Sequence, residues 1–179
     1  MPYLVVIYGP PLAGKSTVAW ELARALPGKA AVVSADQLLG GSIAVSDPDA
    51  EAELEMAHTQ LRLFVANYLK NRYHVVVEGP FCFERDGVLH NFEAEIDQLV
   101  ALMRNLAQRA LIVRLDIDEA VLAGRAREAG REAELPGALR IRAASKGRYG
   151  ERFRAYDSGA MSAQAIATDV RETLTREMT

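Results

Sequence analysis

Cysteine is almost absent from this chain of 179 residues, because Cys82 is the only one. An internal disulfide and a zinc site built from several cysteines are therefore excluded. Cys82 stands between two phenylalanines, which favours a small buried hydrophobic residue over a nucleophile.

Long hydrophobic runs are also lacking. No apolar stretch approaches the roughly 18 residues that span a bilayer, and the N-terminus leads into an apolar strand pattern without the layout of a signal peptide. The composition, 50% hydrophobic and 25% charged, predicts a globular chain and not a disordered one. We expect residues 1–179 to form one domain in the cytoplasm, with no role for a membrane.

Positive charge is missing from one part of the chain and concentrated in another. Residues 36–55 contain six acids and no Lys or Arg, whereas residues 125–154 contain nine bases against four acids. The basic segment predicts a local anionic ligand, and its alternative is a solvated helix face. The formal net charge of −3 gives no overall attraction to nucleic acid.

The most informative motif is the glycine loop G-x-x-x-x-G-K-S at residues 9–16. It follows an apolar run at residues 4–8 and precedes a helical pattern, so that the order is strand, loop and helix. In that setting the motif predicts a phosphate-binding loop instead of a simple glycine turn. Backbone N–H groups and the positive end of the helix would surround phosphate oxygens of a nucleotide. The residues expected to contact it are Gly9, Pro10, Leu12, Ala13, Gly14, Lys15, Ser16 and Thr17.

Two acids are expected at the same edge of the sheet as this loop. A buried strand at residues 30–33 leads to Asp36, and a second at residues 73–77 leads to Glu78. Ligands of open α/β sheets bind at the carboxyl ends of the strands. Asp36 can accept a proton from an acceptor hydroxyl or hold Mg²⁺ through water. The alternative role for Asp36 is that of a helix N-cap. Glu78 is expected to bind Mg²⁺ or its water, together with the Ser16 hydroxyl.

Helices and strands alternate along the remaining chain, which predicts an α/β fold. Helical spacing of apolar residues predicts helices over 47–71 and 92–106, and short apolar runs predict strands over 110–115 and 153–157. Asp118 and Ser162 are expected to cap helices. Two further segments are interpreted as loops that shape an acceptor pocket, residues 37–46 and 81–91. His58 is interpreted as a surface or hydrogen-bonded histidine.

Arginines are frequent in a segment that glycines and a proline interrupt, at residues 119–150. A hinged and basic segment suits a lid, which closes over a nucleotide, excludes water and places positive charge on the transferring phosphoryl group. The candidates for that cation are Arg125, Arg127 and Arg131.

Taken in order, these features resemble the small P-loop kinases. The features are the loop at residues 9–16, Asp36, Glu-Gly-Pro at residues 78–80, the late arginines, and Asp-Ser-Gly at residues 157–159. The chain looks most similar to the branch that contains chloramphenicol phosphotransferase, zeta-toxin-like kinases and polynucleotide-kinase-like domains. Gluconate and shikimate kinases are more distant.

The resemblance implies a three-layer α/β fold with a five-stranded parallel sheet in the order 2-3-1-4-5. It implies ATP and Mg²⁺ as donor and cofactor, with Lys15 and Ser16 holding phosphate and metal. Asp36 would act as the base, an arginine of the lid as the cation, and residues 158–161 would lie against adenine.

Three functional hypotheses follow. The first is an ATP-dependent kinase that phosphorylates a hydroxyl of a small molecule. The second keeps the reaction but takes a nucleotide or polynucleotide end as acceptor, attracted by the basic segment. The third is an ATP-binding regulator with slow hydrolysis, for which the expected switch loop with a threonine is not evident.

Overall fold

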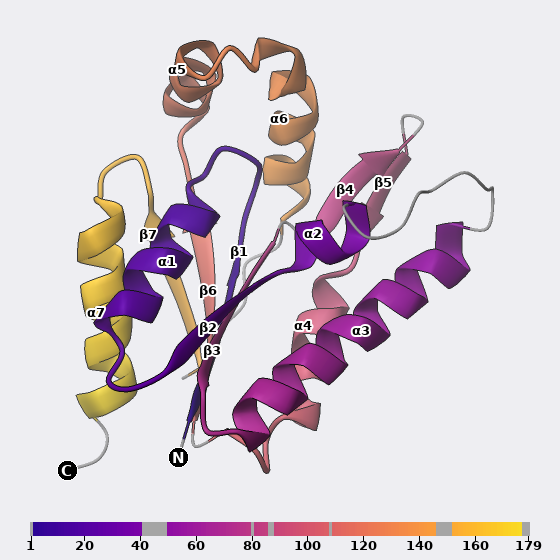
Figure 1. Cartoon of the computed structure of the whole chain (residues 1–179). Helices are drawn as coiled ribbons and strands as arrows, with labels where there is room; N and C mark the ends of the chain where they lie inside the picture. The colour runs from indigo at the N-terminus through magenta and orange to yellow at the C-terminus, as the bar shows by residue number, and fades with distance from the viewer. Residues whose placement is uncertain are drawn as a thin grey trace.

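A parallel sheet of five strands forms the centre of the molecule, in the order β2-β3-β1-β6-β7 (Figure 1). The computed structural model describes residues 2–40, 50–79, 81–85, 88–107, 109–145 and 152–176. The strands of the sheet are β1 (Tyr3–Tyr8), β2 (Ala30–Ser34), β3 (His74–Gly79), β6 (Arg109–Asp116) and β7 (Phe153–Asp157). A separate hairpin takes the numbers 4 and 5, so this arrangement confirms the expected 2-3-1-4-5 order.

Helices cover both faces of the sheet, which gives three layers (Figure 1). On one face, α1 (Lys15–Ala25) and α7 (Ala163–Thr175) pack against side chains such as Val5 and Ile7. On the other face, α3 (Ala50–Lys70) and α4 (Glu93–Leu102) pack against Leu4 and Val6. The alternation along β1 follows from the period of two in a strand, and all six of its residues are buried.

The expected helix caps are present. The Asp118 carboxylate accepts a hydrogen bond from the backbone N–H of Ala120 at 2.8 Å and begins α5 (Glu119–Glu128). The Ser162 hydroxyl accepts one from the N–H of Ala165 at 3.2 Å and begins α7.

The lid segment of the sequence prediction folds as two helices above the carboxyl end of the sheet (Figure 1). After α5 come a short 3-10 helix, η1 (Glu132–Glu134), and α6 (Leu135–Ala144), with Pro136 in its first turn. Pro136 can occupy this place because the first N–H groups of a helix need no intrahelical partner. Residues 146–150, the end of the expected lid, lie outside the described residues.

Two segments that we interpreted as loops contain regular structure. Residues 37–40 belong to α2 (Ala35–Gly40), while residues 41–46 and the expected start of the next helix at Asp47 lie outside the described residues. Residues 81–91 contain the antiparallel pair β4 (Cys82–Arg85) and β5 (Val88–Asn91). The Asp86-Gly87 pair between β4 and β5 is typical of a hairpin, a signal that the interpretation as a loop did not use. The helix α2 depends on a contact with β3 that is described below.

Two isolated residues lie in the interior. Cys82 is a buried free cysteine, as expected, and burial raises the pKa of its thiol to about 11. His58 is buried with its ring tilted against that of Phe92, at 5.2 Å between ring centroids, so the alternative of a surface histidine is wrong. Within the described part of the chain, no helix has the length and apolar composition of a membrane span.

Candidate functional site

The glycine loop between β1 and α1 has a backbone that only certain residues allow. Gly9 has φ 148°, and a Cβ there would lie 2.5 Å from the carbonyl oxygen of Leu115. Leu12 and Gly14 are left-handed, with φ 65° and 88°. A non-glycine residue in this region is strained, and such strain gathers at functional sites. The loop leads directly into the N-terminus of α1, whose unpaired backbone N–H groups suit a phosphate group.

Lys15, the first residue of α1, folds back over this loop. Its ammonium donates a hydrogen bond to the carbonyl oxygen of Pro10 at 2.9 Å, and the residue is only 7% exposed. Burial lowers the pKa of Lys15, whereas the nearby carboxylates of Asp36 and Glu78 raise it and Arg131 lowers it. These four residues are far apart in the sequence, and the fold brings their charged groups close enough to affect the pKa of Lys15.

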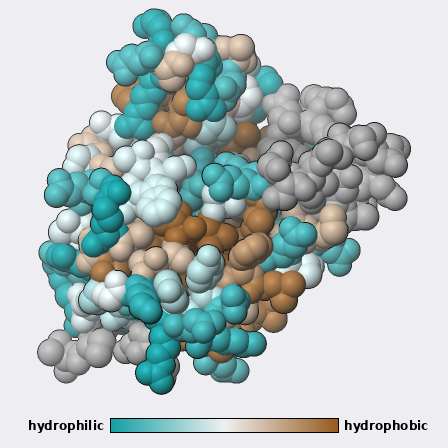
Figure 2. Space-filling model, in the orientation of Figure 1, coloured by the Kyte–Doolittle hydropathy of each residue, from teal (hydrophilic) through white to brown (hydrophobic). Residues whose placement is uncertain are grey.

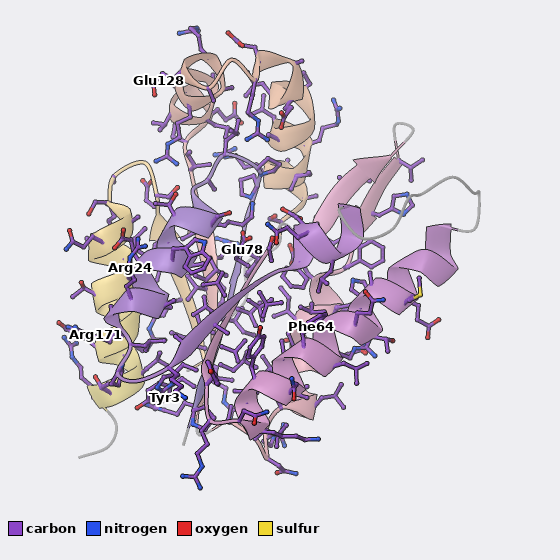
Figure 3. The ribbon with its side chains drawn as sticks, in the orientation of Figure 1. Tyr3, Arg24, Phe64, Glu78, Glu128 and Arg171 are labelled. Carbon is purple, nitrogen blue, oxygen red and sulfur yellow. The ribbon has the colours of Figure 1, made fainter. Side chains whose placement is uncertain are left out.

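The next residue, Ser16, is joined to β3. Its hydroxyl donates a hydrogen bond to Oε2 of Glu78 at 3.1 Å. Glu78 is 3% exposed and is paired in the sheet with Ile7 of β1 and Ser34 of β2. Figure 3 shows it at the upper end of the sheet, below the two lid helices.

This pair fits a magnesium ion that is shared with phosphates. The described residues contain no group of three or more His, Cys, Asp or Glu side chains around a common point, so they offer no cage built from protein alone. Mg²⁺ at nucleotide sites uses one or two protein oxygens, and substrate phosphates and water complete its coordination. A hydroxyl and a carboxylate in contact beside a phosphate loop supply that kind of donor set.

Asp36 lies in the first turn of α2, at the carboxyl end of β2. Loss of water around the carboxyl group raises the pKa of Asp36, and the nearby carboxylate of Glu78 raises it further, whereas the ammonium of Lys15 lowers it. Part of the Asp36 side chain remains exposed. The alternative that Asp36 is a helix N-cap is wrong, because Asp36 already lies within the first turn of α2.

A glycine holds α2 against β3. A Cβ on Gly79 would lie 2.9 Å from the Cβ of Ala35, closer than real side chains approach. The small residue therefore lets Ala35, and with it Asp36, sit beside the end of β3 that carries Glu78. Sequence reasoning quoted Gly79 in Glu-Gly-Pro but missed this positioning role.

The three candidate arginines of the lid occupy different places. Arg125 donates hydrogen bonds to the carbonyl oxygens of Leu12 at 3.1 Å and of Ser158 at 2.5 Å, so it ties α5 to the glycine loop and to the loop after β7. Arg131 forms two hydrogen bonds to the carboxylate of Glu134, at 2.7 and 2.6 Å, on an exposed part of the lid. Arg127 is exposed, and its side chain has no hydrogen-bond or ion-pair partner among the described residues.

A cleft of about 310 Å³ lies beside the glycine loop, between Arg125 and the start of α7. Ser158, whose hydroxyl is buried without a hydrogen-bond partner, belongs to its wall. Apolar surface comes from both sides of the cleft, including Leu12, Val18, Met161 and Ile166. An apolar slot next to a phosphate loop, with a few polar groups, has the character of a site for a nucleobase.

Comparisons with known proteins agree with this geometry. A family model described as an AAA domain matches residues 4–146. A search of the curated proteins finds no relative with significant similarity.

Solved structures match over nearly the whole chain. A gluconokinase from Sinorhizobium meliloti 1021 is 21% identical, with a TM-score of 0.58 over 99% of this chain and 98% of that chain. A shikimate kinase from Acinetobacter baumannii, in complex with shikimate, is 18% identical, with a TM-score of 0.54 over 99% and 95%. The YorR protein of Bacillus subtilis, in complex with phosphorylated GDP, is 17% identical, with a TM-score of 0.62 over 97% and 96%. At these identities the likeness shows a shared fold.

Proposed function

We propose a kinase function for this chain, which belongs to the AAA domain family and has the fold of P-loop kinases. It transfers the γ-phosphoryl group of ATP to a hydroxyl of a small molecule. The proposal treats residues 1–179 as one domain with a lid at about residues 119–150. It places the reaction in the cytoplasm, where a free thiol such as that of Cys82 stays reduced.

The observation that carries the proposal is the hydrogen bond of 3.1 Å between Ser16 and Glu78, next to the buried Lys15. When bound, Mg²⁺ would supply positive charge that offsets the negative charge of the phosphates in the transition state. The Ser16 hydroxyl and the Glu78 carboxylate are the residues that would hold it. The ammonium of Lys15 would exchange the Pro10 carbonyl for oxygens of the terminal phosphates, since a phosphate is the stronger acceptor.

Asp36 is proposed as the general base. Its carboxylate would accept the proton of the acceptor hydroxyl while the hydroxyl oxygen forms a bond to the γ-phosphorus and the bond from that phosphorus to the bridging oxygen of ADP breaks. The raised pKa of Asp36 suits this role, because a base is most effective when its pKa approaches the working pH.

The contacts of the three arginines support separate roles for them. Arg125 is engaged by two backbone carbonyls beside the cleft, so it would anchor the lid and border the nucleobase. Arg131 already acts on the pKa of Lys15, and its guanidinium pairs with the exposed carboxylate of Glu134, so it would turn to the transferring phosphoryl group. Arg127 would remain a solvated residue of the lid.

A nucleotide or polynucleotide acceptor is the second candidate, and the excess of bases in residues 125–154 favours it. Binding of an end that carries phosphate would weaken steeply as salt is raised, because each phosphate contact releases counterions. A neutral hydroxyl compound would show little salt dependence, so the same binding measurement at two salt concentrations separates the candidates.

The function is tested by a panel of sugars, polyols, nucleosides and hydroxylated antibiotics, scored for release of ADP that depends on the acceptor. The proposal expects at least one compound to stimulate release well above the rate without acceptor, and Lys15→Ala to abolish it. Equal ADP release with every compound and without any would contradict a kinase and favour an ATP-binding regulator.

A further inference from the structure

A pocket of about 610 Å³ lies at the carboxyl ends of β6 and β7, beside the end of α6. Its volume is within the range of sites for small molecules. None of the residues that line it takes part in the proposed phosphoryl transfer. The charged residues of its wall are two arginines and three aspartates, namely Arg114, Arg142, Asp116, Asp118 and Asp157.

The pocket is separate from both the proposed acceptor site and the nucleobase cleft. Asp36 follows β2, and β6 stands three positions from β2 in the strand order, about 14 Å away. In Figure 1, β2 lies nearer the viewer than β6 and β7. Arg114 and Asp116 alternate along β6 with Leu115, which packs toward α1 and α7, so they lie on the face of the sheet opposite the nucleobase cleft.

Arg114 is fixed in the wall of this pocket and has one donor without a partner. Its Nη2 donates a hydrogen bond to Oδ2 of Asp116 at 2.8 Å, and its guanidinium lies 5.9 Å from the centroid of the Phe153 ring. Its Nε is buried and has no hydrogen-bond partner among the described residues. Since a buried donor without a partner costs free energy, an acceptor atom brought by a bound molecule would be stabilising.

Ser145, at the C-terminal end of α6, has a second group of this kind. Its backbone N–H ends the helix with a hydrogen bond of 2.9 Å to the carbonyl oxygen of Ile141. Its hydroxyl is buried and finds no hydrogen-bond partner in the part of the chain that the structure describes. Ser145 and Arg114 line the same pocket, so small side-chain rotations bring both groups to one bound molecule.

The charges around the pocket disfavour an ion of either sign. Asp116 and Asp157 are partners in the register of β6 and β7, so their carboxylates lie on the same face of the sheet. Arg114 and Arg142 border the same space, and Arg142 also pairs with Glu119 at 2.9 Å. An anion in the pocket would be repelled by the carboxylates and a cation by the guanidinium groups. An apolar ligand is not indicated either, because the lid that includes α6 has much hydrophilic surface (Figure 2).

Hydroxyl groups match both kinds of charged side chain. A guanidinium only donates hydrogen bonds and a carboxylate only accepts them, whereas a hydroxyl does both. We propose that this pocket is a second binding site, for a small neutral polyol or sugar. Arg114 and Ser145 donate hydrogen bonds to its oxygens, and Asp116 and Asp157 accept hydrogen bonds from its hydroxyls.

A titration of the isotope-labelled full chain with mannitol or with glucose, followed by NMR, tests the proposal. Mannitol is an open-chain polyol and glucose a cyclic sugar, so the two probes separate these sources of hydroxyl groups. The backbone amide signals of residues 114–118 and 155–157 should shift with at least one probe, with a dissociation constant in the millimolar range. Inorganic phosphate and putrescine, an anion and a cation, should bind more weakly at these residues.

Two variants and a matched control locate the binding. Ser145→Ala removes one hydrogen bond and should weaken binding about fivefold. Ala155→Phe places a ring in the pocket from an exposed position of β7 and should abolish binding. Ala101→Phe makes the same change at an exposed position of α4 that does not line the pocket, and should leave binding unchanged.

The titration contains no nucleotide, so its outcome does not depend on the proposed kinase activity. A chain that phosphorylates an acceptor but shows no shifts at residues 114–118 and 155–157 would refute the second site alone. Tighter binding of phosphate or putrescine than of either hydroxyl compound would overturn the assigned ligand class. Binding by Ala155→Phe as tight as that of the wild type would show that the pocket is not the site.

Discussion

The hydroxyl of Ser16 donates a hydrogen bond to the carboxylate of Glu78 at 3.1 Å, although 62 residues separate them in the sequence. This contact joins the first turn of α1 to the carboxyl end of β3. It puts two oxygen ligands of the kind that Mg²⁺ prefers beside the loop that would hold the phosphates.

Glu78→Gln should therefore raise the Mg²⁺ concentration needed for half-maximal activity by at least about tenfold, since the substitution keeps an oxygen but removes its charge. The fold should persist, because the amide can still accept the hydrogen bond of Ser16. A Mg²⁺ titration of activity measures the shift. Glu128→Gln changes an exposed acid on α5 and serves as control; an identical Mg²⁺ requirement in both variants would contradict the metal role of Glu78.

Gly79→Ala should reduce transfer by displacing α2 and with it Asp36. The added methyl group would lie 2.9 Å from the Cβ of Ala35, so one of the two backbones has to shift, at a cost of about 1–3 kcal/mol. Turnover should fall by much more than the affinity for nucleotide, which a titration with a fluorescent ATP analogue would show. Gly124→Ala on α5 meets nothing within 4 Å and should stabilise the fold by about 0.5–1 kcal/mol. Full activity in Gly79→Ala would refute the positioning role.

Arg131→Ala and Arg125→Ala should fail in different ways. Loss of Arg131 should lower kcat by about 10²–10³, as expected for a group that stabilises charge in the transition state, with little change in the KM for nucleotide. Loss of Arg125 should raise that KM and lower the melting temperature, because two backbone contacts disappear. Arg127→Ala should do neither. Steady-state kinetics of the three variants decide the assignment, and a large loss of kcat in Arg127→Ala alone would reverse it.

His74 should make the fold sensitive to mild acid. Its Nδ1 accepts a hydrogen bond from the backbone N–H of Tyr3 at 3.0 Å, and its Nε2 lies 2.7 Å from the carbonyl oxygen of Pro27. Burial lowers the pKa of His74, the bond to Pro27 raises it, and the positive N-terminus lowers it. As the pH falls below about 6.5, the unfolded chain takes up a proton that the native ring resists, so native stability decreases.

Urea unfolding between pH 5 and 7.5 measures this effect, with a limit of about 1.4 kcal/mol per pH unit for each histidine. Burial lowers the pKa of His58 in the same way, so it adds to the slope. His74→Gln keeps one donor and one acceptor without titrating and should flatten the curve. An unchanged slope in that variant would show that His74 is not responsible.

Local signals were enough to predict much of the fold. The strand at residues 153–157 and the caps Asp118 and Ser162 were predicted at the positions where the structure has them, since each depends on a few neighbouring residues. The place of the glycine loop between a strand and a helix was predicted in the same way. The short helix α2 depends on the gap at Gly79, a contact between distant residues that the sequence does not reveal. The pair β4 and β5 had a local signal that the interpretation as a loop overlooked, because Asp86-Gly87 between them is typical of a hairpin turn.

The candidate site shows the same division. Sequence order predicted that Lys15, Asp36 and Glu78 share an edge of the sheet, because parallel strands end together. It could not distinguish the lid arginines, whose roles depend on carbonyl groups and a carboxylate that the fold brings near them, at Leu12, Ser158 and Glu134.

The proposed base is examined most directly through Asp36→Asn, assayed with an acceptor that the panel identifies. The measurement is the amount of phosphorylated acceptor, determined by mass spectrometry, beside the affinity for ATP of the same protein. Our account predicts that transfer is lost while ATP binding is kept. It also predicts that wild-type kcat/KM rises with pH through a carboxyl pKa above the ordinary 3.8, because Asp36 must lose its proton to act as base. Full transfer by Asp36→Asn, with an unchanged pH profile, would contradict the account.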